Sequence, residues 1–462
     1  MIFSVRSSSF CRALYSQPST INQLRPPCTR SRQLTFTQRS TLRSSSSKLT
    51  QLHNHAPKNY FSTDIPNNTK IMEVVVQCSD GVQLAAKEFS SSSKHDHFKL
   101  IKDKTKILCL HGWLDNAASF NLLAPELTTR MYADVIALDF PGHGHSSHKS
   151  SDGPTQILSE YALYVAEALT SLNWIQPLDK SIASRKKKKS DLNSNFNNKN
   201  SEDDSEQGSK ITIIGHSMGA GVALVFAAAY PEYVDRLILL EGAGPLARKG
   251  TDASRHVRQA IERRMTSNKL LYPEFANIEG NIQNPNVKEK SEKFGSDLSR
   301  GKRRYANIQA AVNARMKTAT LTPGNQYIST EAATALVCRA TYPADEVIGS
   351  KTAGGIELDP STYGGPVHFR HDSRLMWPSF HYYTQEQVHA LMDDVRCPTC
   401  LLLANEGWPL DRASFDQSLQ ILQPAMFQQL PGSHHFHADP IDAPAVSDAI
   451  IDFLKQEIKV FR

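Results

Sequence analysis

Cysteine, long apolar runs and, over the first 63 residues, acidic side chains are all scarce in this 462-residue sequence. Seven cysteines are too few for a disulfide scaffold. No stretch of about 18 apolar residues occurs, so we expect no membrane-spanning helix. Hydrophobic residues still make up 40% of the chain, which argues against wholesale disorder. The length predicts one large domain with insertions, or two domains.

The lack of acids concentrates positive charge at the start of the chain. Residues 1–63 contain nine Lys or Arg and thirteen Ser, and the first acid is Asp64. This composition is typical of a transit peptide, so we expect a disordered leader and a mitochondrial protein. The alternative is a basic tail without an address, on a cytoplasmic or peroxisomal protein. Subtracting these nine charges from the net charge of +6 leaves −3 for residues 64–462, so no nucleic-acid partner is expected.

A second segment of unusual composition spans residues 179–209. It contains four consecutive lysines at 186–189, then Asn- and Ser-rich sequence, then a short acidic run at 202–204. Such a tract cannot bury a core, and we expect a disordered, solvated insert.

The body of the chain alternates short apolar runs with helical patterns from residue 71 onward. The alternation predicts an α/β fold, with a mostly parallel central sheet flanked by helices on both faces. Ser79-Asp80-Gly81 predicts a hairpin before the parallel part. We expect strands at 72–78, 83–89, 106–110, 134–139, 211–214, 236–240, 399–404 and 426–430. We expect helices at 119–130, 156–174, 218–230, 411–422 and 441–458.

Residues 242–395 interrupt this alternation. They carry helical patterns at 252–272, 291–317, 329–340 and 384–394, and no obvious buried strand. We therefore divide the body into a first core part (64–241), an inserted helical cap (242–395) and a last core part (396–462). Ligands bind outside the carboxyl ends of strands in such sheets, so a cap inserted there is expected to cover the site.

The strongest chemical signal is Gly215-His216-Ser217-Met218-Gly219, which lies between an apolar strand and a helical pattern. The pattern G-x-S-x-G in that context predicts a nucleophile elbow. The turn is so tight that Gly215 and Gly219 must be small, and it presents the Ser217 hydroxyl above the sheet.

A serine nucleophile needs backbone donors for the negative charge that develops on the carbonyl oxygen. One donor is expected to be the N–H of Met218, the residue after the serine. The second is expected from His111-Gly112-Trp113, which follows the strand at 106–110, with Trp113 donating its backbone N–H.

The general base is expected to be a histidine after the last strand, where Pro431-Gly432-Ser433-His434-His435 lies. We favour His434, at the position nearest the strand end, over His435.

The acid that orients this histidine has three candidates. The usual place follows the strand at 399–404, but Gly407 stands where an aspartate would be expected. We favour Glu241, which closes the strand at 236–240. Glu406 and Asp411 remain alternative acids.

These motifs together resemble the α/β-hydrolase superfamily and, more closely, its serine hydrolase-like protein family. The resemblance is carried by residues 110–117 with Ser119 and Phe120, 139–148, 215–217, 237–240, and 431–432 with His434 and His437. It implies a Ser-acid-His hydrolase with Ser217 as nucleophile and His434 as base. Haloalkane dehalogenases and epoxide hydrolases share the outline but carry an aspartate nucleophile, so Ser217 speaks against both activities.

We therefore expect a serine hydrolase that cleaves an ester-like acyl bond of a small molecule through an acyl-enzyme, without cofactor or metal. Trp113, Phe380, Tyr382 and Trp408 suggest an apolar acyl pocket. The alternatives are C–C hydrolysis or perhydrolysis on the same fold, or a non-catalytic ligand-binding member. Nothing in the sequence indicates an oligomeric state or a natural substrate.

Overall fold

The computed structural model describes residues 69–91, 104–150, 157–176, 210–271, 303–324, 326–346 and 352–457. The chain divides into two units, 1–63 and 64–462, and all described residues belong to the second. The expected leader and the expected insert at 179–209 lie outside the described residues.

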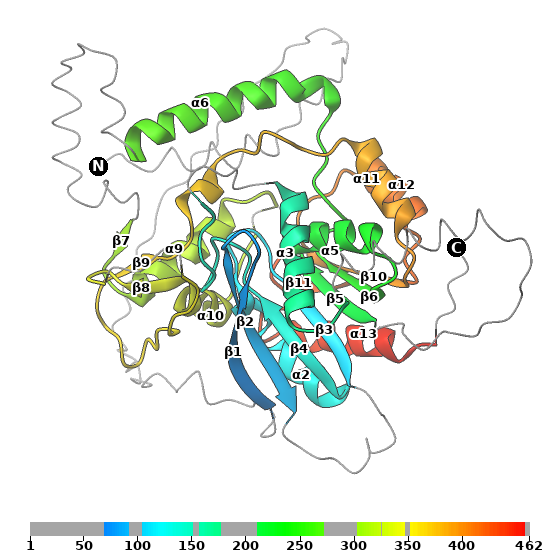
Figure 1. Cartoon of the computed structure of the whole chain (residues 1–462), viewed down its shortest axis with the longest axis horizontal. Helices are drawn as coiled ribbons and strands as arrows, with labels where there is room; N and C mark the ends of the chain where they lie inside the picture. The colour runs from blue at the N-terminus through cyan, green and yellow to red at the C-terminus, as the bar shows by residue number, and fades with distance from the viewer. Residues whose placement is uncertain are drawn as a thin grey trace, which may run out of the picture. The chain divides into compact units, whose positions relative to one another are not determined.

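An eight-stranded sheet forms the centre of the second unit, in the order β1-β2-β4-β3-β5-β6-β10-β11 (Figure 1). The strands β1 and β2 form the expected antiparallel hairpin, β2 pairs antiparallel with β4, and all other neighbours are parallel. The prediction of a mostly parallel sheet is confirmed. The strands are Thr69–Gln77 (β1), Gln83–Ser91 (β2), Thr105–Leu110 (β3), Ala133–Leu138 (β4), Ile211–His216 (β5), Val234–Leu240 (β6), Thr399–Glu406 (β10) and Met426–Ser433 (β11).

Burial along the strands follows their place in the sheet. Every residue of the central strand β5 is buried, because helices cover both faces of the sheet there. The edge strand β11 instead alternates between partly buried and exposed positions over Met426–Pro431. The short apolar run at 211–214 was therefore readable as a buried parallel strand.

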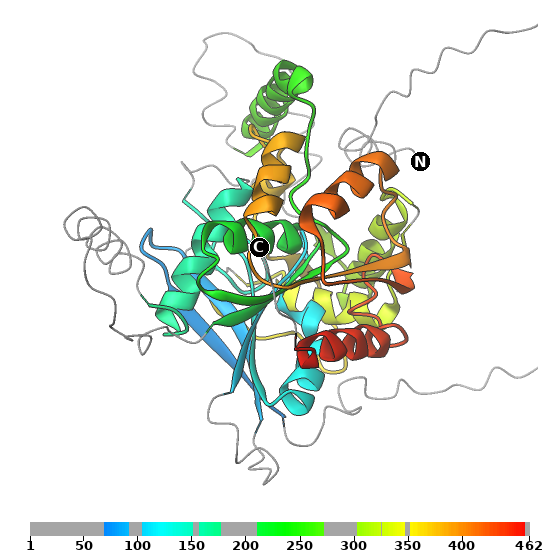
Figure 2. The same ribbon diagram turned by 90° about the vertical axis from the view of Figure 1, so that its right-hand side faces the viewer.

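Helices pack on both faces of the sheet and bury two separate apolar clusters. One face is covered by α3 (Leu158–Ser171), α5 (Met218–Ala229) and α11 (Gln385–Asp394), with α12 (Arg412–Leu422) beside α11. The other face is covered by η2 (Ala117–Phe120), α2 (Leu123–Arg130) and α13 (Ala443–Lys455). Figure 2 separates the two sets, with α13 in red on one side of the strands and α5 in green on the other.

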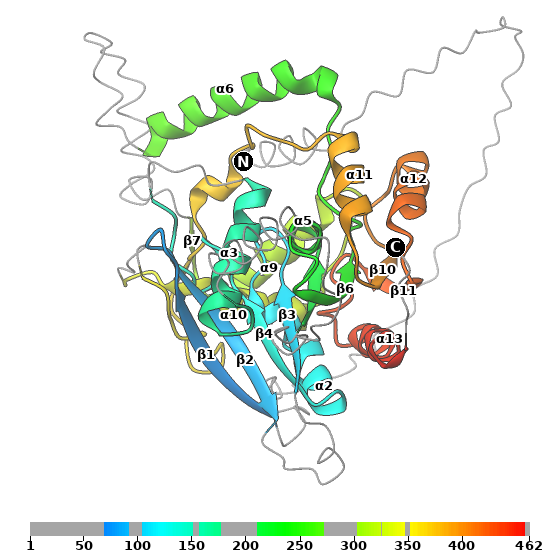
Figure 3. The same cartoon turned by 45° about the vertical axis from the view of Figure 1, so that its right-hand side comes forward.

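The inserted segment 242–395 contains helices, as expected, and also a small antiparallel sheet in the order β7-β9-β8. The sequence pattern does not predict this sheet because its strands are only two or three residues long. Figure 3 shows α6 standing above the remaining elements of the segment. The elements before α11 are η3 (Gly250–Asp252), α6 (Ala253–Leu271), β7 (Arg304–Tyr305), α9 (Ile308–Thr320), α10 (Thr330–Ala340), β8 (Thr341–Pro343), β9 (Val367–Phe369) and η4 (Ser373–Met376).

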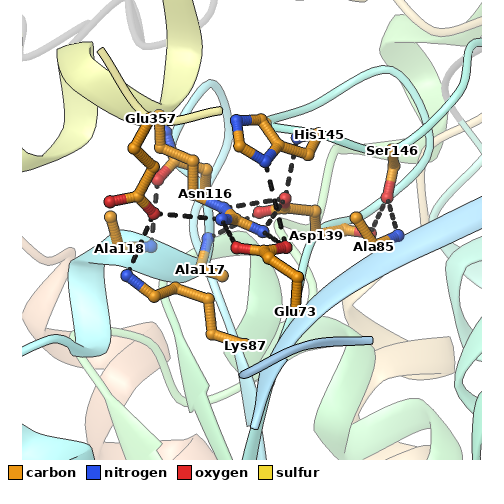
Figure 4. Close-up of polar contacts among 12 residues, drawn as sticks. Glu73, Ala85, Lys87, Asn116, Ala117, Ala118, Asp139, His145, Ser146 and Glu357 are labelled. Atoms are coloured by element: carbon orange, nitrogen blue, oxygen red, sulfur yellow. Dashed lines mark hydrogen bonds and ion pairs between the residues drawn. The ribbon is translucent and has the colours of Figure 1, made fainter. Parts of the chain in front are cut away.

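A buried ion-pair cluster joins the inserted segment to the central sheet. Arg339, at the end of α10, is fully buried and its guanidinium contacts three carboxylates. It lies 2.8 Å from Asp139, which follows β4, and also pairs with Glu73 of β1 and with Glu357. Lys87 of β2 completes the cluster through Glu357, and Figure 4 shows the side chains of Glu73, Asp139 and Glu357 turned towards one another.

Candidate active site

The serine of the elbow stands on a strained turn between β5 and α5. Ser217 has a φ of 52° and a ψ of −114°, a conformation that side-chain-bearing residues rarely adopt. A Cβ at Gly215 would overlap the backbone of Gly219 and Ala220, and a Cβ at Gly219 would overlap the carbonyl of Leu110. The close approach of β3, β5 and α5 therefore requires glycine on both sides of the serine.

Three of the residues singled out in the sequence meet at the carboxyl ends of β5, β6 and β11. The Nε2 atom of His434 lies 3.0 Å from Oγ of Ser217, and its Nδ1 atom lies 2.9 Å from Oε2 of Glu241. The side chains of His434 and Glu241 are only 6% and 3% exposed. One histidine thus bridges a hydroxyl and a carboxylate, each at hydrogen-bonding distance, away from solvent.

The other two candidate acids lie elsewhere. Asp411 is exposed and caps α12 by accepting a hydrogen bond from the N–H of Ser414. Glu406 is exposed at the end of β10. At Gly407, where an aspartate was expected, a Cβ would overlap the carboxylate of Glu241. The carboxylate from β6 therefore occupies the space that a side chain at 407 would need.

Burial sets the protonation preferences of this pair. It raises the pKa of Glu241 to about 7, although the backbone N–H groups of Ala404 and Trp408 donate to the carboxylate and oppose the shift. Burial also lowers the pKa of His434 well below its usual value. The imidazole is therefore neutral near pH 7, which is the form that can accept a proton from a hydroxyl.

Of the two backbone donors expected for an oxyanion, Met218 directly follows the serine, and Trp113 lies in the loop after β3, the strand next to β5. Within the described part of the chain, neither the N–H of Trp113 nor that of Met218 donates to a protein acceptor. His111 braces this region, since its Nε2 accepts a hydrogen bond from the N–H of Phe140 at 3.0 Å. Both N–H groups are thus available to a ligand.

His435, the alternative base, belongs to a second polar cluster. Its Nε2 atom lies 3.1 Å from Asp115, and Arg315 of α9 lies 2.6 Å from the same carboxylate. Burial would raise the pKa of Asp115, but His435 and Arg315 outweigh it and hold that pKa well below its usual value. Asp115 therefore ties the inserted segment to the loop that carries both histidines. Asp115 belongs to the 110–117 stretch, where the sequence carries no signal for this role.

Two buried side chains fix the backbone of His434. Nε2 of His216, next to the serine, lies 2.8 Å from the carbonyl of His434. Gln326, from the inserted segment, accepts a hydrogen bond from the N–H of His434 at 2.9 Å and donates one to the carbonyl of Gly407, also at 2.9 Å. Gln326 thus links the loops after β10 and β11, and no local sequence signal pointed to it.

The four aromatic residues expected around an acyl pocket fall into two groups. Trp408 stacks on the imidazole of His434, and the indole N–H of Trp113 donates to the carbonyl of Leu375. Phe380 instead lies under Arg264 of α6, and Tyr382 packs against the same helix through His256. Of these four aromatic residues, Trp408 is the one for which the structure shows a ring contact with His434.

The described residues contain no group of His, Cys, Asp or Glu side chains arranged to hold a metal ion. Among the same residues, no helix has the length and apolar character needed to cross a bilayer.

Comparison with known proteins supports the α/β-hydrolase fold and a similarity to serine hydrolase-like proteins. The family model for the alpha/beta hydrolase fold matches residues 106–268. A serine hydrolase-like protein of Dictyostelium discoideum is 26% identical over 83% of this chain and 82% of its own length. One from Danio rerio is 28% identical over 76% of this chain and 82% of its own length. The crystal structure of a hypothetical protein from Pseudomonas aeruginosa PAO1 is similar with a TM-score of 0.55 and 27% identity, over 83% of this chain and 99% of that one.

Proposed function

Because the chain belongs to the α/β-hydrolase superfamily and resembles its serine hydrolase-like proteins, we propose that it is a serine hydrolase that cleaves an ester-like acyl bond. The observation that carries the proposal is the bridge formed by His434, with Ser217 3.0 Å from one ring nitrogen and Glu241 2.9 Å from the other. Nucleophile, base and orienting acid are the three groups that acyl transfer by serine requires.

In the proposed reaction, Nε2 of His434 takes the proton of Ser217 as Oγ attacks the substrate carbonyl. The Nδ1–H of the imidazole donates to Glu241, which fixes the tautomer and stabilises the imidazolium that forms. The oxyanion accepts hydrogen bonds from the N–H groups of Trp113 and Met218. The imidazolium then protonates the leaving group.

Water completes the proposed cycle. His434 accepts a proton from the water molecule that attacks the acyl-enzyme, and the acid product leaves with Ser217 restored. The strained φ of Ser217 supports this role, since strain of this kind persists only where the surrounding structure imposes it. The substrate is proposed to be a small acyl compound.

A fluorophosphonate probe tests the proposal, because it labels only a serine that a base has activated. We expect the folded wild-type protein to be labelled at Ser217, and labelling to be lost in Ser217→Ala. Ser119→Ala, which alters a buried serine outside the bridge, is the matched control and should label normally. Absence of labelling in folded wild-type protein would contradict the proposal and favour a ligand-binding member of the fold.

A labelled enzyme that releases no acid from a series of acyl esters would instead favour C–C hydrolysis or perhydrolysis. Esters of graded acyl length therefore separate the proposed reaction from these alternatives.

A further inference from the structure

The ring of Trp408 lies flat against the imidazole of His434. The two ring centroids are 4.6 Å apart and the planes differ by 16°. The other rings beside this imidazole approach at steep angles, 52° for His216 and 84° for His435. Among these neighbours, only the indole stacks face to face with the histidine.

The backbone of the same tryptophan contacts the acid. The N–H of Trp408 donates to Oε2 of Glu241 at 3.3 Å, and that oxygen also lies 2.9 Å from Nδ1 of His434. Its predecessor Gly407 leaves just enough room for the carboxylate. Residues 407–408 therefore border both members of the acid–base pair.

The side chain of Gln326 connects the two loops that carry the stacked rings. Gln326 is 2% exposed and joins the carbonyl of Gly407 to the N–H of His434. The residue before the indole and the residue that carries the imidazole are thus tied to one amide group. A shift of either loop would break a buried hydrogen bond, so the two rings are kept together.

Stacking has a chemical consequence when the histidine becomes charged. The face of an indole is electron-rich and attracts a cation lying over it. In the proposed reaction His434 gains a proton in the transition state, so the attraction is stronger there than in the resting enzyme. The flat contact also blocks rotation of the imidazole away from Ser217.

We propose that Trp408 is a positioning residue for His434, which it holds between Ser217 and Glu241 and whose imidazolium its indole face stabilises. This role rests on the proposed serine hydrolase function. It also distinguishes Trp408 from a residue that merely lines an acyl pocket, because it predicts effects that do not depend on the acyl group.

The test compares Trp408→Leu, which keeps apolar cover but removes the aromatic face, with Trp408→Phe, which keeps a smaller face. We expect the rate constant for fluorophosphonate labelling to fall by roughly 3- to 30-fold in Trp408→Leu and by less in Trp408→Phe. The matched control is Trp377→Leu, since Trp377 is a buried tryptophan that packs against Arg264.

A second readout is the pKa of His434, followed by NMR of the imidazole, which does not require an active enzyme. It should fall in Trp408→Leu, recover in part in Trp408→Phe, and stay unchanged in Trp377→Leu. A folded Trp408→Leu with the wild-type pKa and labelling rate would overturn the proposal. A lowered His434 pKa in Trp408→Leu, together with no labelling of the wild-type protein, would instead contradict the proposed function and leave the stack established.

Discussion

Two buried carboxylates at the carboxyl ends of sheet strands behave in opposite ways. Asp139 follows β4 and accepts hydrogen bonds from the N–H groups of Ala117 and His145. Glu241 follows β6 and accepts hydrogen bonds from the N–H groups of Ala404 and Trp408. Burial raises the pKa of both, but the guanidinium of Arg339 outweighs it at Asp139 and lowers that pKa to about 2. The pKa of Glu241 is raised to about 7.

The difference lies in the partner. Asp139 faces a permanent cation, so its charge is fixed and joins the inserted segment to the sheet. Glu241 is paired with two backbone N–H groups and with an imidazole that is neutral near pH 7, so it keeps a high affinity for a positive charge that arises nearby. A carboxylate of the second kind suits a reaction in which its histidine is transiently protonated.

The largest expected effect comes from Glu241→Gln. The amide keeps the shape but cannot stabilise an imidazolium, so we expect the labelling rate to fall by about 1,000- to 10,000-fold. The unfolding free energy should change little, because the amide need not be ionised in a buried place. Glu406→Gln, in the exposed neighbouring acid, should label at the wild-type rate. If labelling slowed in Glu406→Gln and not in Glu241→Gln, the acid that orients His434 would be Glu406.

Arg339→Met should act mainly on stability, whereas Glu241→Gln should act mainly on labelling. It leaves Asp139 buried without its cation, and we expect a loss of about 3–5 kcal/mol in unfolding free energy, measured by urea denaturation. The control is Arg130→Met, which breaks an exposed pair with Asp448 and should cost no more than about 1 kcal/mol. Equal losses of unfolding free energy in the two variants would show that the buried Arg339 cluster contributes no more to stability than the exposed pair.

The smallest effect is a dependence on pH that separates activity from stability. Because the pKa of Glu241 is raised to about 7, the Glu241–His434 pair should take up a proton below that pH. Labelling should then fall about tenfold per pH unit below about pH 7 and level off above it.

The unfolding free energy should not follow this fall. A raised pKa in the folded state means that Glu241 contributes stability at low pH, which is lost as the pH rises towards about 7. The lowered pKa of Asp139 means that its contribution is lost only as the pH falls towards about 2. If labelling and unfolding free energy fell in parallel between about pH 7 and pH 5, the contrast between the raised pKa of Glu241 and the lowered pKa of Asp139 would be contradicted.

The fold was predictable because its signals are local. The apolar run before Gly215 and the helical pattern after Gly219 mark the strand, turn and helix of the elbow without reference to the rest of the chain. The candidate base could be found in the same way, since His434 directly follows the last strand. The acid could only be narrowed to three residues, because the choice depends on which strands are neighbours.

What the sequence did not reveal depends on contacts between distant segments. Arg339 meets Asp139 across 200 residues, and Gln326 meets His434 across 108. Neither the arginine nor the glutamine lies in a recognisable motif, and each looks like an ordinary polar residue in a helical or loop pattern. Their importance arises from burial, which follows from the assembled structure and not from their immediate neighbours.

The amide of Gln326 carries a consequence for engineering. Its oxygen and nitrogen are used in opposite senses, one accepting from His434 and the other donating to Gly407, so a carboxylate or a hydrocarbon of the same length could not replace it. The loops of the sheet are therefore joined by a group that the inserted segment supplies. A chimera that exchanged this segment to change substrate preference would have to bring an equivalent amide with it, or its histidine loop would lose this anchor.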